Sequence, residues 1–283
     1  MNDKYAVIGN PITHSKSPRI HALFAASVNQ HINYEKRLAP LGDFGGELQR
    51  FFDAGGVGAN VTVPFKQDAF ALADKASLRA QQAGAANFLM WRGDHWYCDN
   101  TDGAGLVRDI ETNLQVSLKG KRVLLLGAGG AARGVIGPLF LCSPKQIVVV
   151  NRTPERATEL VAAYVNQYPA SALSIDALVV QPIKFDVVIN ATSSSLSATL
   201  PLPESAAIFA PDALAYDMMY GQQPTRFMSW ALRQGAARVA DGLGMLVEQA
   251  AESYVQWRGV LPEAAPIIAQ LRAELAGERP PSA

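Results

Sequence analysis

The chain has 283 residues, with 25 basic and 25 acidic side chains, so its formal net charge is zero; hydrophobic residues make up 49%. This balance gives no indication of binding to nucleic acid or to an anionic membrane, both of which need a basic excess. No apolar stretch is long enough to cross a bilayer, and the N-terminus lacks the shape of a signal peptide. The only cysteines, Cys98 and Cys142, do not have metal-ligand spacing. We therefore expect a cytoplasmic protein with free thiols and no bound metal, a monomer or homodimer that acts on a small molecule.

Strand and helix patterns alternate through the first hundred residues. Strands are expected at 5–8, at 33–38 and from the glycines near 56 through Val63, with two short strands at 84–91 and 95–98. Helices are expected at 17–28, where Ser17 and Pro18 form an N-cap and first-turn pair, and at 43–53 and 67–76. This alternation predicts an α/β domain.

A dinucleotide-binding pattern lies in the middle of the chain. The apolar run Val123–Leu126 is typical of a strand buried on both faces, and it leads into the glycine-rich segment 127–134. A helical segment follows to about Leu141, and residues 147–150 indicate the next parallel strand. Glycines at a strand-to-helix turn let the backbone approach a pyrophosphate at the helix N-terminus. The order of strand, turn, helix and strand favours this interpretation over an ordinary loop.

We expect an α/β fold with two domains. Residues 1–102 would form a substrate-binding and catalytic domain, completed by 242–283, and residues 103–241 a Rossmann-type domain. Two helical stretches, about 243–257 and 262–276, would return to pack on the first domain and place the active site in the cleft between the domains.

The residues after the second Rossmann strand indicate which cofactor binds. An NAD site would place Asp or Glu there, whereas this chain has Asn151-Arg152-Thr153-Pro154-Glu155-Arg156. Guanidinium groups suit the 2′-phosphate of NADP. Thr153 and Pro154 also suit the start of a helix, and the two interpretations are compatible. NADP is the expected cofactor.

Three loop segments of the first hundred residues carry chemistry: residues 9–18, rich in small hydroxyls, residues 60–66, which end in Lys66, and residues 99–103, which hold two carboxylates. Each of them alone is also compatible with ordinary helix capping and turn chemistry.

Together with later segments, these loops resemble the shikimate dehydrogenase family over nearly the whole chain. The matching segments, in order, are GNPITHSKSP, NVTVPFK, DNTDG, GAGGAARG, NRTPER, NATSS, YDMMY and DGLGMLVEQAA. The resemblance implies a reversible, NADPH-dependent reduction of 3-dehydroshikimate to shikimate, a step of the shikimate pathway toward chorismate and the aromatic amino acids. Lys66 and Asp102 would be the catalytic pair, although Asp102 could instead orient the 4-hydroxyl and leave proton transfer to Lys66.

The resemblance also implies the binding residues. Besides the catalytic pair, those expected to bind substrate are Ser15, Ser17, Thr62, Asn87, Tyr220 and Gln249. Those expected to bind cofactor are Gly127, Ala128, Gly129, Gly130, Ala131, Asn151, Arg152, Thr153, Arg156, Thr192, Met218 and Gly242.

Two positions depart from the family pattern. Phe88 stands where the family has Thr, and Ser195 where it has Gly. On a strand, neighbours point to opposite faces, so Phe88 would face the core if Asn87 faces substrate. Two alternatives remain: a paralogue acting on quinate or an amino analogue, with NAD as a possible cofactor, and a nucleotide-binding regulator without catalysis. The presence of both Lys66 and Asp102 argues against a regulator.

Overall fold

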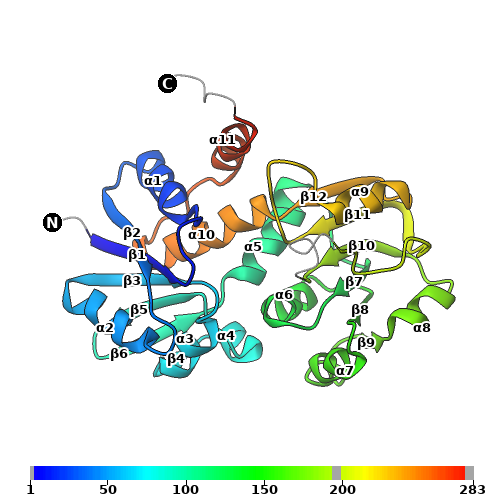
Figure 1. Ribbon diagram of the computed structural model, residues 1–283, viewed down its shortest axis with the longest axis horizontal. Helices are drawn as coiled ribbons and strands as arrows, with labels where there is room; N and C mark the ends of the chain where they lie inside the picture. The colour runs from blue at the N-terminus through cyan, green and yellow to red at the C-terminus, as the bar shows by residue number, and fades with distance from the viewer. Residues whose placement is uncertain (1–2, 193–198, 278–283) are drawn as a thin grey trace. The chain divides into compact units, whose positions relative to one another are not determined.

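The computed structural model describes residues 3–192 and 199–277, and the chain divides into two compact units (Figure 1). Unit 1 comprises Met1–Gly105 and Leu246–Ala269, and unit 2 comprises Leu106–Met245 and Gln270–Ala283. Each unit is built on one six-stranded sheet. The expected α/β class is thereby confirmed, with a Rossmann-like second sheet and C-terminal helical residues that belong to unit 1.

Unit 1 contains a mixed sheet with the strand order β2-β1-β3-β5-β6-β4. The strands are β1 (Asp3–Gly9), β2 (Ile32–Leu38), β3 (Gly56–Val61), β4 (Lys75–Ala76), β5 (Phe88–Arg92) and β6 (His95–Asp99). Strand β1 pairs in parallel with β2 and β3, whereas β5 runs antiparallel to β3 and β6. The carboxyl ends of β1 and β3 therefore lie at the same edge, where parallel sheets commonly carry their ligand sites.

The helices of unit 1 are α1 (Ser17–Ser27), α2 (Phe44–Asp53), α3 (Lys66–Leu72), α4 (Leu78–Ala83) and the residues of α10 (Leu243–Arg258) from Leu246 onward. Alternate residues of β1 and β3 pack with the apolar face of α2 in one buried cluster. Near the C-terminal end of α10, the ring of Trp257 contacts Tyr5 and Phe88. These contacts fix α10 against the sheet.

Three of the predicted boundaries in this unit are wrong. The helix expected at 67–76 ends at Leu72, and α4 forms where no helix was predicted. Ser77 caps α4 by accepting a hydrogen bond from the Ala80 N–H, and Gly84 ends it with a φ of 60°. The strand expected at 84–91 consequently begins only at Phe88. The strand expected through Val63 ends at Val61, because a turn closed by the Phe65 N–H and the Thr62 carbonyl follows it.

Unit 2 contains an all-parallel sheet with the order β12-β11-β10-β7-β8-β9. The strands are β7 (Arg122–Leu126), β8 (Gln146–Val150), β9 (Ala170–Leu173), β10 (Phe185–Asn190), β11 (Phe209–Asp217) and β12 (Arg238–Asp241). The remaining helices are α5 (Asp102–Arg108, which begins in unit 1), a π-helical turn η1 (Asp109–Asn113), α6 (Gly130–Leu141), α7 (Pro154–Ala162), α8 (Ile175–Val180), α9 (Arg226–Arg233) and α11 (Ala265–Ala276). This strand order is that of the doubly wound dinucleotide-binding fold.

Both faces of β7 are buried, as the apolar run predicts. Val123 and Leu125 belong to the core that includes α6 and α7, while Leu124 and Leu126 belong to the core that includes α8 and α9. The change of direction in strand order falls between β7 and β10, so their carboxyl ends frame the expected ligand crevice.

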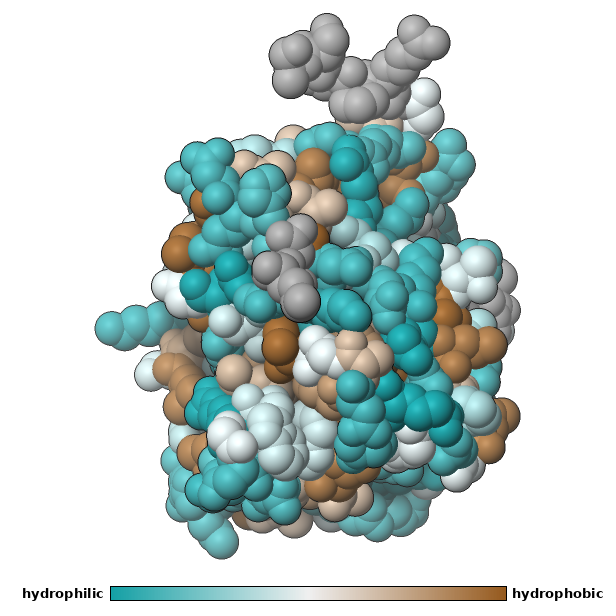
Figure 2. Space-filling model, turned by 90° about the vertical axis from the view of Figure 1, so that its left-hand side faces the viewer, coloured by the Kyte–Doolittle hydropathy of each residue, from teal (hydrophilic) through white to brown (hydrophobic). Residues whose placement is uncertain are grey.

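The surface in Figure 2 is mainly hydrophilic, with hydrophobic residues in small groups. Within residues 3–192 and 199–277, none of the helices combines the length and the apolar character that a membrane span requires.

Candidate active site

The two predicted catalytic residues meet in unit 1. Lys66 is the first residue of α3, and Asp102 is the first residue of α5. The Lys66 Nζ donates a hydrogen bond to the Asp102 Oδ2 at 2.5 Å, and the side chains are 31% and 12% exposed. The pair is thus half-buried but open enough for a ligand to reach it.

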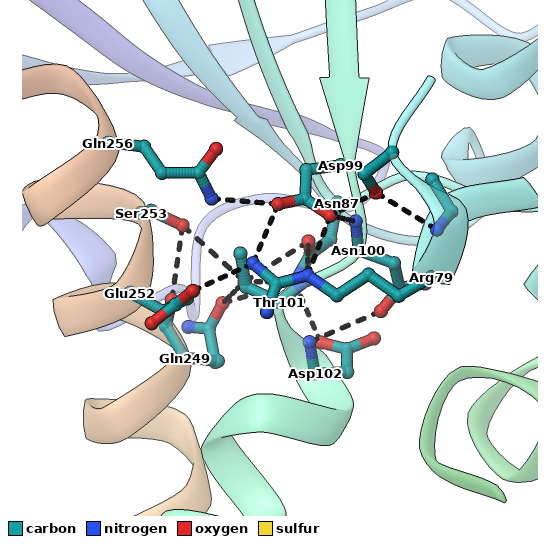
Figure 3. Close-up of polar contacts among 12 residues, drawn as sticks. Arg79, Asn87, Asp99, Asn100, Thr101, Asp102, Gln249, Glu252, Ser253 and Gln256 are labelled. Carbon is teal, nitrogen blue, oxygen red and sulfur yellow. Dashed lines mark hydrogen bonds and ion pairs between the residues drawn. The ribbon is translucent and has the colours of Figure 1, made fainter. Parts of the chain in front are cut away.

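Asn87 orients the carboxylate of this pair (Figure 3). Its Nδ2 donates to the Asp102 Oδ1 at 2.8 Å, which is the carboxylate oxygen that Lys66 does not contact. Its Oδ1 accepts the Thr101 N–H at 2.8 Å. Because the buried amide is held at both ends, it fixes the direction in which the carboxylate of Asp102 points.

Helix α10 contributes Gln249 to the same cluster. The Gln249 Oε1 accepts from the Asn87 Nδ2 at 3.2 Å and from the Thr101 hydroxyl at 3.4 Å. One turn later, the Ser253 hydroxyl accepts from the Asn60 Nδ2 at 2.9 Å. A residue almost 150 positions away in sequence is therefore placed beside the catalytic carboxylate.

Sequence reasoning missed Asn60, Thr101 and Ser253 as members of this cluster. Asn60 and Thr101 lie inside the NVTVPFK and DNTDG segments, so the signal that could have found them was present. Ser253 follows the last matching segment, and only the packing of α10 identifies it.

Ser15, Ser17 and Thr62 lie near the carboxyl ends of β1 and β3. The Ser15 and Ser17 hydroxyls are 3.2 Å apart, and the Ser17 N–H donates to the Ser15 Oγ at 3.3 Å. The Thr62 N–H donates to the Ile8 carbonyl at 3.0 Å. Ser17 is the first residue of α1, and Lys16 holds the N-cap position, so the predicted capping role of Ser17 is wrong. Its hydroxyl interacts with Ser15 instead.

The glycine-rich turn of unit 2 has the properties of a phosphate cradle. Gly127 has a φ of 106°, and a Cβ on it would lie 3.1 Å from the Ala191 carbonyl oxygen, so other residues would be strained there. A Cβ on Gly129 or Gly130 would meet none of the described atoms within 4 Å. Gly129 occupies the N-cap position of α6. Ala128 is buried and Ala131 is exposed. This open helix N-terminus fits the pyrophosphate of a dinucleotide.

Other predicted cofactor residues follow the neighbouring strands. The Thr192 hydroxyl donates to the Asn190 Oδ1 at 2.7 Å, and the Met218 N–H donates to the Asn190 carbonyl at 3.0 Å. Gly242 packs against the backbone of Met218, which leaves no room for a side chain. The structure therefore brings Thr192, Met218 and Gly242 to the edge that also carries the glycine-rich turn. Ser195, the departure from the family pattern, lies outside the described residues.

The predicted phosphate-recognition segment follows β8. Asn151 donates its Nδ2 hydrogen to the Thr153 carbonyl at 2.9 Å, and Thr153 holds the N-cap position of α7 without a side-chain capping bond. Arg152 and Arg156 are exposed. Two accessible guanidinium groups beside a strand end fit a 2′-phosphate.

Tyr220 lies in unit 2, three residues after β11. Burial raises the pKa of its phenol, and the negative charge of Asp241 adds to this effect. The phenol is therefore protonated at neutral pH and can donate a hydrogen bond. Its joint role with Ser15 and Ser17 remains a prediction.

The described part of the chain offers no group of three or more His, Cys, Asp or Glu side chains that could hold a metal ion. The chemistry of the cluster is that of a lysine, a carboxylate and neutral hydrogen-bonding groups.

Three family models match the chain in succession. Residues 7–89 match the shikimate dehydrogenase substrate-binding domain, residues 109–200 match shikimate/quinate 5-dehydrogenase, and residues 242–272 match the shikimate 5′-dehydrogenase C-terminal domain. The chain belongs to the shikimate dehydrogenase family. This confirms the resemblance inferred from the eight sequence segments.

Relatives match over nearly full length. The shikimate dehydrogenase (NADP(+)) of Dechloromonas aromatica is 55% identical over 97% of this chain and 99% of its own length. That of Alcanivorax borkumensis is 53% identical over 95% and 96%.

Two solved structures are also similar. The Ael1 enzyme from Pseudomonas putida has a TM-score of 0.90 at 45% identity, covering 99% of this chain and all of its own. A shikimate 5-dehydrogenase from Thermus thermophilus, in complex with NADP(H) and shikimate, has a TM-score of 0.82 at 31% identity, covering 94% and 97%.

Proposed function

We propose that the chain reduces 3-dehydroshikimate to shikimate with NADPH, reversibly, and that Lys66 and Asp102 carry the proton transfer. The activity and the cofactor are those of relatives more than 50% identical over almost the whole chain. The observation that supports the assignment of residues is the Lys66–Asp102 contact, reinforced by Asn87.

Oxidation of shikimate at its 3-hydroxyl removes a proton from oxygen and a hydride from carbon. NADP, when bound, accepts the hydride. Lys66 takes the hydroxyl proton, and in the reverse direction its ammonium group returns a proton to the carbonyl oxygen. Asp102 holds the lysine side chain through its Oδ2, and its orientation is set by Asn87 through its Oδ1. In this arrangement Asp102 also accepts a hydrogen bond from the neighbouring substrate hydroxyl.

The carboxylate of the substrate is bound by hydroxyl groups. Ser15 and Ser17 present adjacent hydroxyls at the start of α1, and the protonated phenol of Tyr220 is a third donor. Gln249 and Thr62 complete the set of polar groups for the ring hydroxyls. Hydroxyl donors position a small acid without the conformational entropy that a long arginine side chain would lose.

NADP is held by the residues of unit 2. The open glycines at the N-terminus of α6 accept the pyrophosphate, and Arg152 and Arg156 pair with the 2′-phosphate. Asn151 and Thr153 shape the turn that presents these arginines. Thr192, Met218 and Gly242 line the same edge of the sheet and complete the cofactor site.

Steady-state kinetics with shikimate and quinate, each with NADP and with NAD, test this proposal. Quinate carries an extra tertiary hydroxyl beside its carboxylate, and the hydroxyls of Ser15 and Ser17 are already committed to that carboxylate. An unsatisfied buried hydroxyl costs about 1–3 kcal/mol, so shikimate should be preferred roughly ten- to hundred-fold in kcat/KM. Comparable values for the two acids would favour the quinate-type alternative. Phe88 gives that alternative no support, because its ring is fully buried against Trp257 and offers no polar group.

A further inference from the structure

A second charged cluster lies directly behind the catalytic residues, centred on Asp99 at the end of β6 (Figure 3). Asp99 is only 3% exposed. Its carboxylate accepts two hydrogen bonds from Arg79, from Nε at 2.7 Å and from an Nη at 2.6 Å. It also accepts from the Ser77 hydroxyl and from the Gln256 Nε2, the latter at 2.8 Å. The arginine forms the fork-shaped, two-point contact that a lysine cannot reproduce.

This cluster joins three elements of unit 1. Arg79 lies on α4, Asp99 ends β6, and Gln256 lies on α10. Arg79 also donates to the Glu252 Oε1 at 2.8 Å, which gives α10 a second attachment. Burial raises the pKa of Asp99, but the hydrogen bonds and the charge of Arg79 outweigh burial and hold that pKa below its usual value. Asp99 is therefore an anion in the folded protein at neutral pH.

Two short connections lead from Asp99 to the catalytic residues. Along the chain, its carboxylate accepts the Asn100 N–H at 2.7 Å, and the Asn100 Oδ1 accepts the Asp102 N–H at 3.2 Å. Across the sheet, its main-chain carbonyl accepts the Asn87 N–H at 3.1 Å. Displacement of Asp99 would consequently move both Asp102 and the amide that orients it.

Helix α10 provides a third connection. Gln249, Ser253 and Gln256 recur at helical spacing and so lie on one face. Gln249 contacts Asn87, while Gln256, two turns later, contacts Asp99. The position of this helix face relative to β6 is thus set by the charged cluster at one end and used by the catalytic cluster at the other.

We propose that Arg79 and Asp99 are positioning residues for the reaction: by tying α4, β6 and α10 together, they hold the Asp102 carboxylate and the Gln249 amide in their reactive orientation. A buried ion pair contributes little net stability compared with apolar packing, since its desolvation offsets its attraction. Its effect in this protein is on geometry. The inference rests on the proposed roles of Lys66 and Asp102.

The test compares Arg79→Met with a matched control, Arg258→Met. Arg258 also attaches α10 within unit 1, through Asp3 and Gln30, but it lies at the end of the helix away from Gln249. The two arginine side chains are similarly exposed, 25% and 22%. Both variants are measured for unfolding in urea, and kcat and KM are determined per folded protein.

Arg79→Met should lower kcat/KM for shikimate by about 10- to 100-fold, the scale for a displacement of about 1 Å at a reacting group. KM for NADP should stay unchanged, because the cofactor residues lie in unit 2. Arg79→Lys, which keeps the charge but not the fork, should recover part of the loss. Asp99→Asn should resemble Arg79→Met, and the double variant should be no worse than the poorer single one, since the two residues act as a unit. Arg258→Met should lose stability but keep wild-type kinetic constants.

Wild-type kinetic constants in folded Arg79→Met, or equal kinetic losses in Arg79→Met and Arg258→Met, would overturn the inference. If Arg79→Met does not fold, Arg79→Lys decides by the same comparison. Lys66→Met is assayed alongside. An active Lys66→Met refutes the proposed catalytic roles, whereas an inactive one combined with wild-type kinetics for the Arg79 variants refutes only the positioning role.

Discussion

Replacing Lys66 by Met separates the proton-transfer role of this residue from its contribution to stability. Methionine keeps an unbranched side chain of similar length but cannot exchange a proton. In the structure it would remove the 2.5 Å contact with Asp102, whose carboxylate would keep its hydrogen bond from Asn87. The site should therefore retain its shape and its ability to bind shikimate.

The two expected effects differ in size. Loss of a positioned acid or base lowers turnover by about 10²–10⁴-fold, which corresponds to about 2.7–5.4 kcal/mol of activation free energy. Loss of a half-buried ion pair costs stability of about 1–3 kcal/mol, between the values for exposed and for buried pairs. KM for shikimate should change far less than kcat, because the carboxylate-binding hydroxyls are untouched.

Initial rates of NADPH formation from shikimate, expressed per folded protein after urea unfolding, measure both effects. Lys66→Arg is the matched variant: it keeps a cation beside Asp102, but a guanidinium does not release its proton at accessible pH. It should be almost as slow as Lys66→Met. Turnover within about tenfold of wild type in either variant would refute the assignment, since a general acid or base supplies at least about a hundredfold.

Three further outcomes are expected. Arg152→Asp should weaken NADP binding by about one to two decades and leave NAD unchanged, because only NADP carries the 2′-phosphate; equal weakening of both cofactors in titrations would make Arg152 structural. Phe88→Ala should lower the unfolding free energy by about 3–5 kcal/mol, as for a fully buried ring, while KM for shikimate stays nearly constant; a large rise in KM would place this side chain in the substrate site. Burial lowers the pKa of His21 to about 3, although the neighbouring Asn60 side chain acts in the opposite direction. The unfolded state then binds more protons than the folded state below about pH 6.5, so stability is lost as pH falls from there toward 3. His21→Phe should remove about 1.4 kcal/mol per pH unit of that dependence in urea unfolding between pH 6 and 4, and an unchanged slope would show that the burial of His21 does not cause it.

The sequence by itself determined the fold class and the family. Buried parallel strands need continuous apolar runs, and a strand-to-helix turn near a phosphate needs glycine, so Val123–Gly130 was legible without coordinates. The catalytic lysine and aspartate were found because they lie in short segments with unusual combinations of residues. Local rules also placed most strands to within a few residues.

Only the tertiary structure decided the rest, because the remaining contacts join residues distant in sequence. Helix α4 was not predicted, and so Arg79 had no expected role; its partner Asp99 appeared only as part of a turn segment. Ser253 and Gln256 carry no local signal, since a polar residue on a helix gives no indication of what it faces. Their placement depends on α10 packing against β6 and α4, where a buried carboxylate must find hydrogen-bond donors wherever the fold supplies them.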